Sequence, residues 1–281
     1  MGKFSDILLT VDYDRTLTAP DSTIPQRNLE AIRYFMAEGG AFTVNTGRSL
    51  PMTHTFRDIV PVNAPLLLYN GSAAYDLEKQ EMLFQHEIQD DMWEVVNLCR
   101  REFPHMVVEV QALDAHYCFD KNPMWEALSH RCRCPWGFAR PGDDLGPFLK
   151  FTLYGEIRTP VLADLFEFSQ PEDARIMDEA EEKLHRLFGD RMEIFRAAGR
   201  ILDVQTKGIS KLRSARELQA LLGRKTLVCV GDGENDVNML SGADYSWCPS
   251  DAVVKDRYKN VCSCAEGAVA DVIYHKIPEI I

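Results

Sequence analysis

The sequence predicts an α/β protein with a doubly wound parallel sheet and an inserted α+β domain. Strand-length apolar runs at 7–11 and 41–45 each end at a polar or glycine-bearing turn. The middle third of the chain instead alternates apolar and polar residues over short runs, which is typical of antiparallel strands. We therefore expect a core domain of residues 1–83 and 203–281, with residues 84–202 inserted as a second domain.

The first half of the core is expected to open with a right-handed parallel crossover. The apolar run at 7–11 is followed by a helical pattern that begins at Pro25 and by a second strand at 41–45. Strand, helix and strand with short joints form such a crossover. A third apolar run, at 65–69, ends at an Asn-Gly turn.

The inserted domain is expected to combine two helices with several antiparallel strands. We expect the strands at 106–111, 116–119, 148–154, 192–196 and 201–204, and the helices at 90–103 and 173–188.

The second half of the core resumes the parallel-sheet pattern. A helix is expected at 211–222, with Ser210 as its N-cap, followed by a strand at 226–230. A helix-like stretch at 252–258, a short strand near Val261 and a final helix complete the chain.

Composition excludes some classes of partner. With 43 acidic and 31 basic residues among 281, the formal net charge is −12, which disfavours a nucleic acid or an anionic membrane surface. No apolar stretch is long enough to cross a bilayer, and the first residues lack the apolar region of a signal peptide. We therefore expect a cytoplasmic protein whose 8 cysteines stay reduced. Nothing in the sequence indicates its oligomeric state.

Four carboxylates are expected to meet at one edge of the sheet. Asp12 and Asp14 follow the first strand, and Asp232 and Asp236 follow the strand at 226–230. Parallel sheets bind ligands at the carboxyl ends of their strands. Close carboxylates repel one another unless a cation lies between them, and oxygen ligands select a hard ion such as Mg²⁺.

Three further residues have features suited to binding phosphate. Thr46 and Gly47 offer a hydroxyl and a backbone N–H without a neighbouring Cβ, although a simple turn is the alternative. Lys211 lies in the first turn of a helix, where its charge opposes the helix dipole unless an anion binds there. Lys207 is a competing candidate, and a solvated surface lysine is the alternative for both.

Together these segments resemble the haloacid dehalogenase superfamily, in its Cof-like phosphatase branch. The resemblance rests on the order and spacing of the motifs at 12–16, 46–48, 70–71, 208–211 and 231–236. It implies a Rossmann-like core sheet, and it implies that the inserted domain is the α/β cap of that branch.

The resemblance also implies a role for each candidate residue. Asp12 would be the nucleophile that forms an aspartyl-phosphate, and Asp14 would act as general acid and base. Asp12, Asp232 and the backbone carbonyl of Asp14 would hold Mg²⁺. The remaining roles are phosphate binding by Thr46, Gly47, Lys211 and Asn235, and support of the metal waters and of Lys211 by Asp236.

The chain departs from the family pattern at Arg15, where the family usually has glycine. Arg15 would either narrow the site and add a cation beside it, or point outward. A second feature is the segment from His130 to Arg140, which concentrates cations and aromatics. That segment is interpreted either as a substrate lid or as an exposed loop.

The function expected from the resemblance is Mg²⁺-dependent hydrolysis of a small phosphorylated metabolite such as a sugar phosphate. A phosphosugar mutase, resembling phosphomannomutase, and a non-catalytic regulatory or binding protein are the alternatives. The sequence does not identify the substrate or the pathway.

Overall fold

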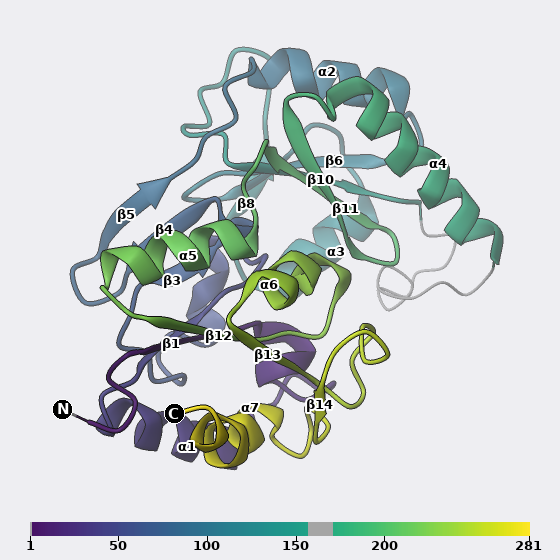
Figure 1. Ribbon diagram of the computed structural model, residues 1–281. Coiled ribbons are helices and arrows are strands. Elements are labelled where there is room, and N and C mark those ends of the chain that lie inside the picture. The colour runs from purple at the N-terminus through teal and green to yellow at the C-terminus, as the bar shows by residue number, and fades with distance from the viewer. Residues whose placement is uncertain (1, 157–170) are drawn as a thin grey trace. The chain divides into compact units, whose positions relative to one another are not determined.

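The computed structural model describes residues 2–156 and 171–281, and these form two compact units (Figure 1). We call Met1–Arg48, His54–Phe84 and Ser210–Ile281 the core unit. The inserted unit comprises Ser49–Thr53 and Gln85–Ile209.

A five-stranded parallel sheet forms the centre of the core unit, with the strand order β14-β13-β12-β1-β2. Its strands are β1 (Ile7–Val11), β2 (Ala41–Val44), β12 (Thr226–Val230), β13 (Tyr245–Pro249) and β14 (Asn260–Val261). All five residues of β1 are buried, because helices cover both faces of the sheet. The chain starts in the middle of this sheet and adds strands on both sides, so the predicted doubly wound α/β class is confirmed.

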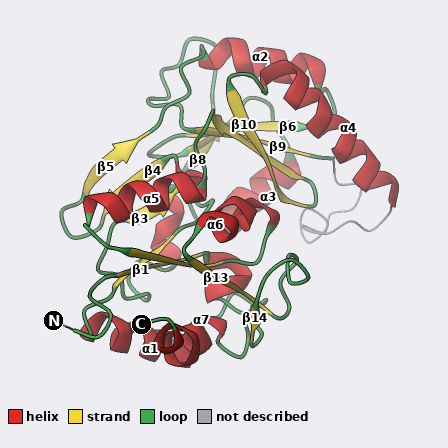
Figure 2. Cartoon of the chain, in the orientation of Figure 1, coloured by secondary structure: helices red, strands yellow, loops and turns green. Residues whose placement is uncertain are grey.

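Helices pack on the two faces of this sheet. They are α1 (Gln26–Ala37), α5 (Lys211–Leu221), α6 (Val237–Gly242) and α7 (Ala268–Asp271), the last continued by single turns at Val272–Lys276 and Ile277–Glu279. Figure 2 shows α1 and α7 on one side of the sheet and α5 and α6 on the other. Within the described ranges, no helix combines the length and the apolar character needed to span a membrane.

The prediction of a helix at 252–258 is wrong, because this stretch forms successive tight turns. Its backbone bonds join residues three apart, as from Arg257 N–H to the carbonyl of Val254. The N–H of Val254 itself donates to the carbonyl of Asp232, at 3.3 Å. This tertiary bond uses a donor that an α-helix would need.

The third apolar run forms β3 (Leu66–Leu68), which pairs antiparallel with β4 (Ala73–Asp76) in a small sheet completed by β5 (Glu81–Gln85). An isolated parallel bridge between Asn45 and Leu67 links β3 to the chain just after β2. The end of β3 therefore lies beside the turn that carries Thr46.

A six-stranded sheet forms the inserted unit, in the order β10-β11-β9-β6-β7-β8. The strands are β6 (Val107–Gln111), β7 (His116–Cys118), β8 (Trp136–Phe138), β9 (Lys150–Tyr154), β10 (Met192–Ala198) and β11 (Ile201–Thr206). Neighbouring strands pair antiparallel, except that β7 and β8 pair parallel. Its helices are α2 (Met92–Glu102), α3 (Pro123–Cys132) and α4 (Pro171–Phe188).

The unit boundaries lie near 84/85 and 209/210, whereas the sequence placed them at 83/84 and 202/203. The second difference arises because β11 pairs along its length with β9 and β10. Within the expected insertion of 84–202, residues 157–170 lie outside the described part of the chain.

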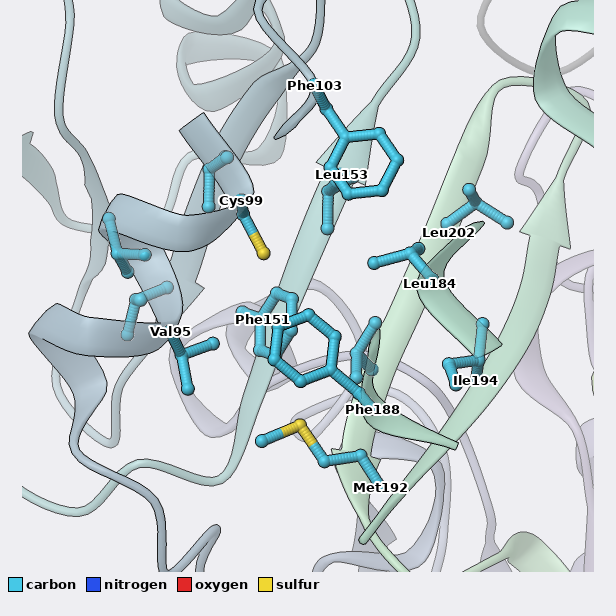
Figure 3. Close-up of a cluster of buried hydrophobic side chains, with 14 of the residues drawn as sticks. Val95, Cys99, Phe103, Phe151, Leu153, Leu184, Phe188, Met192, Ile194 and Leu202 are labelled. Atoms are coloured by element: carbon cyan, nitrogen blue, oxygen red, sulfur yellow. The ribbon is translucent and has the colours of Figure 1, made fainter. Parts of the chain in front are cut away.

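One face of this sheet is apolar and packs against α2 and α4. Figure 3 shows side chains from both helices and from the strands pointing toward one another. Phe151 lies at the centre, with its ring 5.8 Å from that of Phe148 and 6.1 Å from that of Phe188. Burying each such side chain stabilises the fold by about 1.5–3 kcal/mol.

The opposite face of the same strands is polar and yet buried, because side chains alternate between the two faces of a strand. It carries Glu109, Gln111, Lys150, Thr152, Asp203 and Gln205, none more than 5% exposed. Asp203 accepts hydrogen bonds from Lys150, at 2.9 Å, and from Thr152, at 2.7 Å. The polar atoms of this face thus satisfy one another in part.

The segment from His130 to Arg140 is not a single open loop. It contains the end of α3, a left-handed residue at Arg133 (φ 51°), and β8. The ring of Trp136 packs edge to face against Trp125, at 5.4 Å, while the arginines of the segment are exposed.

Candidate active site

Three carboxylates meet at the carboxyl ends of β1 and β12. Asp12 follows β1, and Asp232 and Asp236 follow β12; one oxygen of each lies within 4.8 Å of the others. Exposed fractions are 7% for Asp12, 8% for Asp232 and 0% for Asp236. The N–H of Asp12 donates to the carbonyl of Val230, so the strand pairing itself holds the two segments together.

Lys211 inserts a positive charge into this cluster. Its Nζ donates to Asp12 Oδ1 at 2.6 Å and to Asp236 Oδ1 at 2.7 Å, and the residue is 1% exposed. Asn45, at the end of β2, donates to the carbonyl of Lys211 and so fixes the start of α5. Burial alone would lower the pKa of Lys211, but the Asp12 and Asp236 carboxylates raise it above its ordinary value.

One ammonium does not balance three buried carboxylates. Burial raises the pKa of Asp12 well above its ordinary value; Lys211 opposes this rise, and Asp236 and Asp232 add to it. Burial and the charge of Asp236 raise the pKa of Asp232 to about 7. A cation at this edge would relieve the repulsion, and the buried carboxylate oxygens fit a hard ion such as Mg²⁺.

Asp236 organises the turn after β12. Its Oδ2 accepts hydrogen bonds from the N–H groups of Asp232 and Gly233, both at 3.0 Å, while its Oδ1 accepts from Lys211. A Cβ on Gly231 would lie 2.5 Å from Asp236 Cγ, so only glycine allows this carboxylate to sit under the turn. Because both oxygens of Asp236 already accept hydrogen bonds, Asp12 and Asp232 are better placed to coordinate a cation.

The residues expected to bind phosphate lie in a second group in the same unit. Thr46 Oγ1 accepts from the N–H of Arg48, at 3.2 Å, so the hydroxyl hydrogen can be donated elsewhere. A Cβ on Gly47 would lie 2.8 Å from Asn70 Oδ1, and that same oxygen accepts a hydrogen bond from Asn235 at 3.3 Å. The Asn70 side chain therefore lies between Gly47, which it approaches closely, and Asn235, which donates a hydrogen bond to it.

Gly71 joins this group to the start of α5. Its φ is +99°, and a Cβ there would lie 2.3 Å from the carbonyl oxygen of Ser210. Because Gly71 has no Cβ, the turn after β3 packs closely against the start of the helix that begins with Lys211.

Asp14 is turned to a different partner. Its two carboxylate oxygens accept from Nε and Nη2 of Arg48, both at 2.8 Å, and its side chain is 50% exposed. The Arg48 guanidinium lies 4.7 Å from the centre of the Tyr13 ring and also donates to Thr55 Oγ1.

Arg15 occupies the left-handed region, with φ 59° and ψ 10°. Its N–H donates to Thr18 Oγ1 at 3.1 Å, and its side chain is exposed. Its charge acts on the carboxylate edge, since it is among the groups that lower the pKa of Asp232 against the larger effect of burial.

Three contributors to this site were absent from the residues predicted by sequence. Thr16 donates to Asp232 Oδ1 at 3.0 Å, Asn70 links the phosphate-binding candidates, and Arg48 pairs with Asp14. Thr16, Arg48 and Asn70 all lie inside the family motifs at 12–16, 46–48 and 70–71, but nothing in the sequence indicates which partner each side chain takes.

Comparison with known proteins agrees with this architecture. A family model described as haloacid dehalogenase-like hydrolase matches residues 9–273. A protein of Buchnera aphidicola subsp. Schizaphis graminum named "Putative phosphatase" is 21% identical over 251 residues, covering 83% of this chain and 80% of that protein.

Solved structures share the fold over nearly the whole chain. A haloacid dehalogenase-like hydrolase from Bacteroides thetaiotaomicron has a TM-score of 0.77 and 21% identity, covering 99% of this chain and 100% of that chain. A second protein of that organism, described among phosphatases of the haloalkanoate enzyme superfamily, has a TM-score of 0.74 and 18% identity over 95% of this chain and 94% of that chain. Since the family model spans most of the sequence and the fold agrees, the resemblance seen in the motifs is confirmed, and this chain belongs to the haloacid dehalogenase-like hydrolases.

Proposed function

We propose that this hydrolase is a Mg²⁺-dependent phosphatase that cleaves small phosphate monoesters through an aspartyl-phosphate on Asp12. The main support is the position of Asp12, whose carboxylate is buried beside Asp232 and Asp236 and accepts a hydrogen bond from Lys211. The names of the phosphatases among its relatives agree with this chemistry.

Asp12 and Asp232, with the backbone carbonyl of Asp14, would hold the metal. Bound there, Mg²⁺ would neutralise charge on the phosphoryl oxygens and on the carboxylates around it. Lys211, Thr46, the N–H of Gly47 and Asn235 would bind the phosphate oxygens, and Asp236 would keep Lys211 oriented.

In the first step a carboxylate oxygen of Asp12 attacks phosphorus while the bond from phosphorus to the ester oxygen breaks. Asp14 donates its proton to that departing oxygen, so the alcohol leaves neutral. In the second step a water attacks phosphorus, Asp14 takes one of its protons, and inorganic phosphate leaves with the Asp12 carboxylate restored.

The inserted unit is proposed to be the cap that selects the substrate. Sugar phosphates are the proposed substrate class, following the resemblance of the sequence motifs to the Cof-like phosphatases. In the segment from His130 to Arg140, the arginines are exposed, which suits a substrate lid.

A cytoplasmic location is also proposed. All 8 cysteines lie in the described part of the chain and none forms a disulfide, which suits a reducing compartment. The net charge of −12 supports a small-molecule substrate over a nucleic acid or an anionic membrane.

A screen of phosphorylated metabolites tests the proposal. The enzyme should release inorganic phosphate in Mg²⁺ and none after chelation, and Asp12→Asn should abolish turnover because an amide cannot form the intermediate. Substantial activity in Asp12→Asn would contradict the mechanism. Dependence on a bisphosphate activator without net phosphate release would indicate a mutase, and Mg²⁺ binding without turnover would indicate a regulatory protein.

A further inference from the structure

The pairing of Asp14 with Arg48 conflicts with the role of Asp14 as proton donor and acceptor. Both oxygens of Asp14 accept from the Arg48 guanidinium at 2.8 Å. To carry or transfer a proton, Asp14 has to give up one of these two bonds. We propose that Arg48 is a positioning residue that holds Asp14 in a resting orientation and releases it when phosphate binds; this inference rests on the proposed function.

Arg48 is the fixed member of the pair. Its side chain is 19% exposed, against 50% for Asp14, and its guanidinium also contacts neighbours other than Asp14. These neighbours include the Tyr13 ring, which is buried and packs on Phe56 with ring centres 4.5 Å apart, and Thr55 Oγ1 at 3.1 Å. When the pair opens, we therefore expect Asp14 to move and Arg48 to stay.

The trigger for release is the phosphate group of the substrate. The N–H of Arg48 donates to Thr46 Oγ1, so Arg48 belongs to the same turn as the proposed phosphate-binding residues. A dianionic phosphate at this turn competes with Asp14 for the guanidinium, because arginine forms strong bidentate bonds with phosphate. Asp14 then rotates toward the leaving group.

A comparison of two esters tests this role by kinetics. When glycerol 2-phosphate is cleaved, the leaving alkoxide needs a proton from Asp14 in the first step. When p-nitrophenyl phosphate is cleaved, nitrophenolate leaves without protonation, so this step depends little on Asp14. The kcat/KM for glycerol 2-phosphate divided by that for p-nitrophenyl phosphate therefore reports on proton donation by Asp14. Arg48→Gln should raise this ratio roughly two- to fivefold, the range that follows from the small free energy of an exposed ion pair. In an Asp14→Asn background, Arg48→Gln should leave the ratio unchanged.

Arg100→Gln is the matched control. Arg100 forms the same two-bond fork with Asp120, at 2.9 and 2.8 Å, within the inserted unit. The Arg100→Gln variant should leave the ratio of the two kcat/KM values unchanged. Equal loss of activity on both esters in Arg48→Gln would show that Arg48 only contacts phosphate and would overturn the proposal.

Thermal unfolding tests the pairing of Arg48 with Asp14 without requiring turnover. Failure of this inference can therefore be distinguished from failure of the proposed function. The Tm shifts of Arg48→Gln, Asp14→Asn and the double variant should be non-additive by roughly 1–3 °C in the ligand-free enzyme. With Mg²⁺ and orthovanadate as the phosphate mimic, the shifts should become additive. Additive shifts in the ligand-free enzyme, or coupling that stays unchanged although vanadate raises the Tm of the native protein, would each overturn the proposal.

Discussion

Lys211 Nζ lies 2.6 Å from Asp12 Oδ1, although 199 residues separate the two in the chain. The contact forms because β1 and β12 are neighbours in the parallel sheet and α5 leads into β12. It places a buried cation against the carboxylate cluster, at a point where solvent cannot compensate for its loss.

Replacing Lys211 by Met should destabilise the metal-free protein by about 3–5 kcal/mol, because removal of one partner leaves buried charges unpaired. Urea denaturation with and without Mg²⁺ measures this, and added Mg²⁺ should restore part of the loss. The control is Lys225→Met, which breaks an ion pair whose lysine is 77% exposed and should change stability little. Equal stability of Lys211→Met and the native chain would show that Lys211 does not balance the cluster.

Mg²⁺ should raise the Tm of the native protein, because a cation relieves the repulsion between Asp12 and Asp232. At a concentration 100-fold above Kd the gain is about 2.7 kcal/mol. A thermal-shift titration measures it, and Asp232→Asn should weaken the response strongly. Asp58→Asn, at a carboxylate that is 84% exposed, should respond like the native protein. A full response in Asp232→Asn would argue against a metal at this edge.

Stability should depend on pH through the buried pair of His116 and Glu109. Burial opposes the charge on each, but the partner outweighs it: the pKa of His116 rises to about 9 and that of Glu109 falls to about 2. Cys134 and Ser49 also face the His116 ring, at 3.6 and 2.7 Å.

The sign of the effect differs for the two groups. Stability from His116 is fully present below its ordinary pKa of 6.5 and is lost as pH rises through about 9. Stability from Glu109 is present above its ordinary pKa of 4.5 and is lost as pH falls through about 2. The pair should therefore stabilise the fold most between pH 4.5 and 6.5.

Urea denaturation of His116→Gln across this range checks the pair. The free-energy difference from the native protein should be largest near pH 6 and shrink toward pH 9.5. The control variant is His275→Gln, at an imidazole that is 62% exposed, which should give no such trend. A difference that stays constant with pH would mean that His116 contributes by packing alone.

Arg15→Gly should stabilise the protein by about 1 kcal/mol, because glycine adopts the left-handed conformation at φ 59° without steric cost. Arg15→Ala removes the same charge but keeps a Cβ, so it should not show this gain. Denaturation of both variants separates backbone strain from charge. If Gly and Ala have the same effect, strain at Arg15 is not being relieved.

Local pattern was sufficient to predict most of the core. The apolar runs at 7–11 and 226–230 form strands of a parallel sheet, whose strands are buried on both faces and therefore apolar along their length; the ends of these strands carry Asp12 and Asp232. The helix starting at Lys211 follows from its N-cap Ser210, whose side chain accepts the N–H of Arg213. Each of these features depends on neighbours in sequence.

Other features depended on contacts between distant segments. The stretch at 252–258 has helical periodicity, but the carbonyl of Asp232 takes the N–H of Val254, so turns form instead. The boundary of the inserted unit follows from the pairing of β11 with β9 and β10, which no local pattern encodes.

The same division holds within the site. Sequence alone determined that carboxylates end two buried strands, because residue type and strand periodicity are local properties. Only the tertiary structure decided that Lys211 lies between Asp12 and Asp236, and that Asp14 takes Arg48 as its partner. Partner choice depends on side-chain direction and on distances across the fold, and the order of residues along the chain does not contain these.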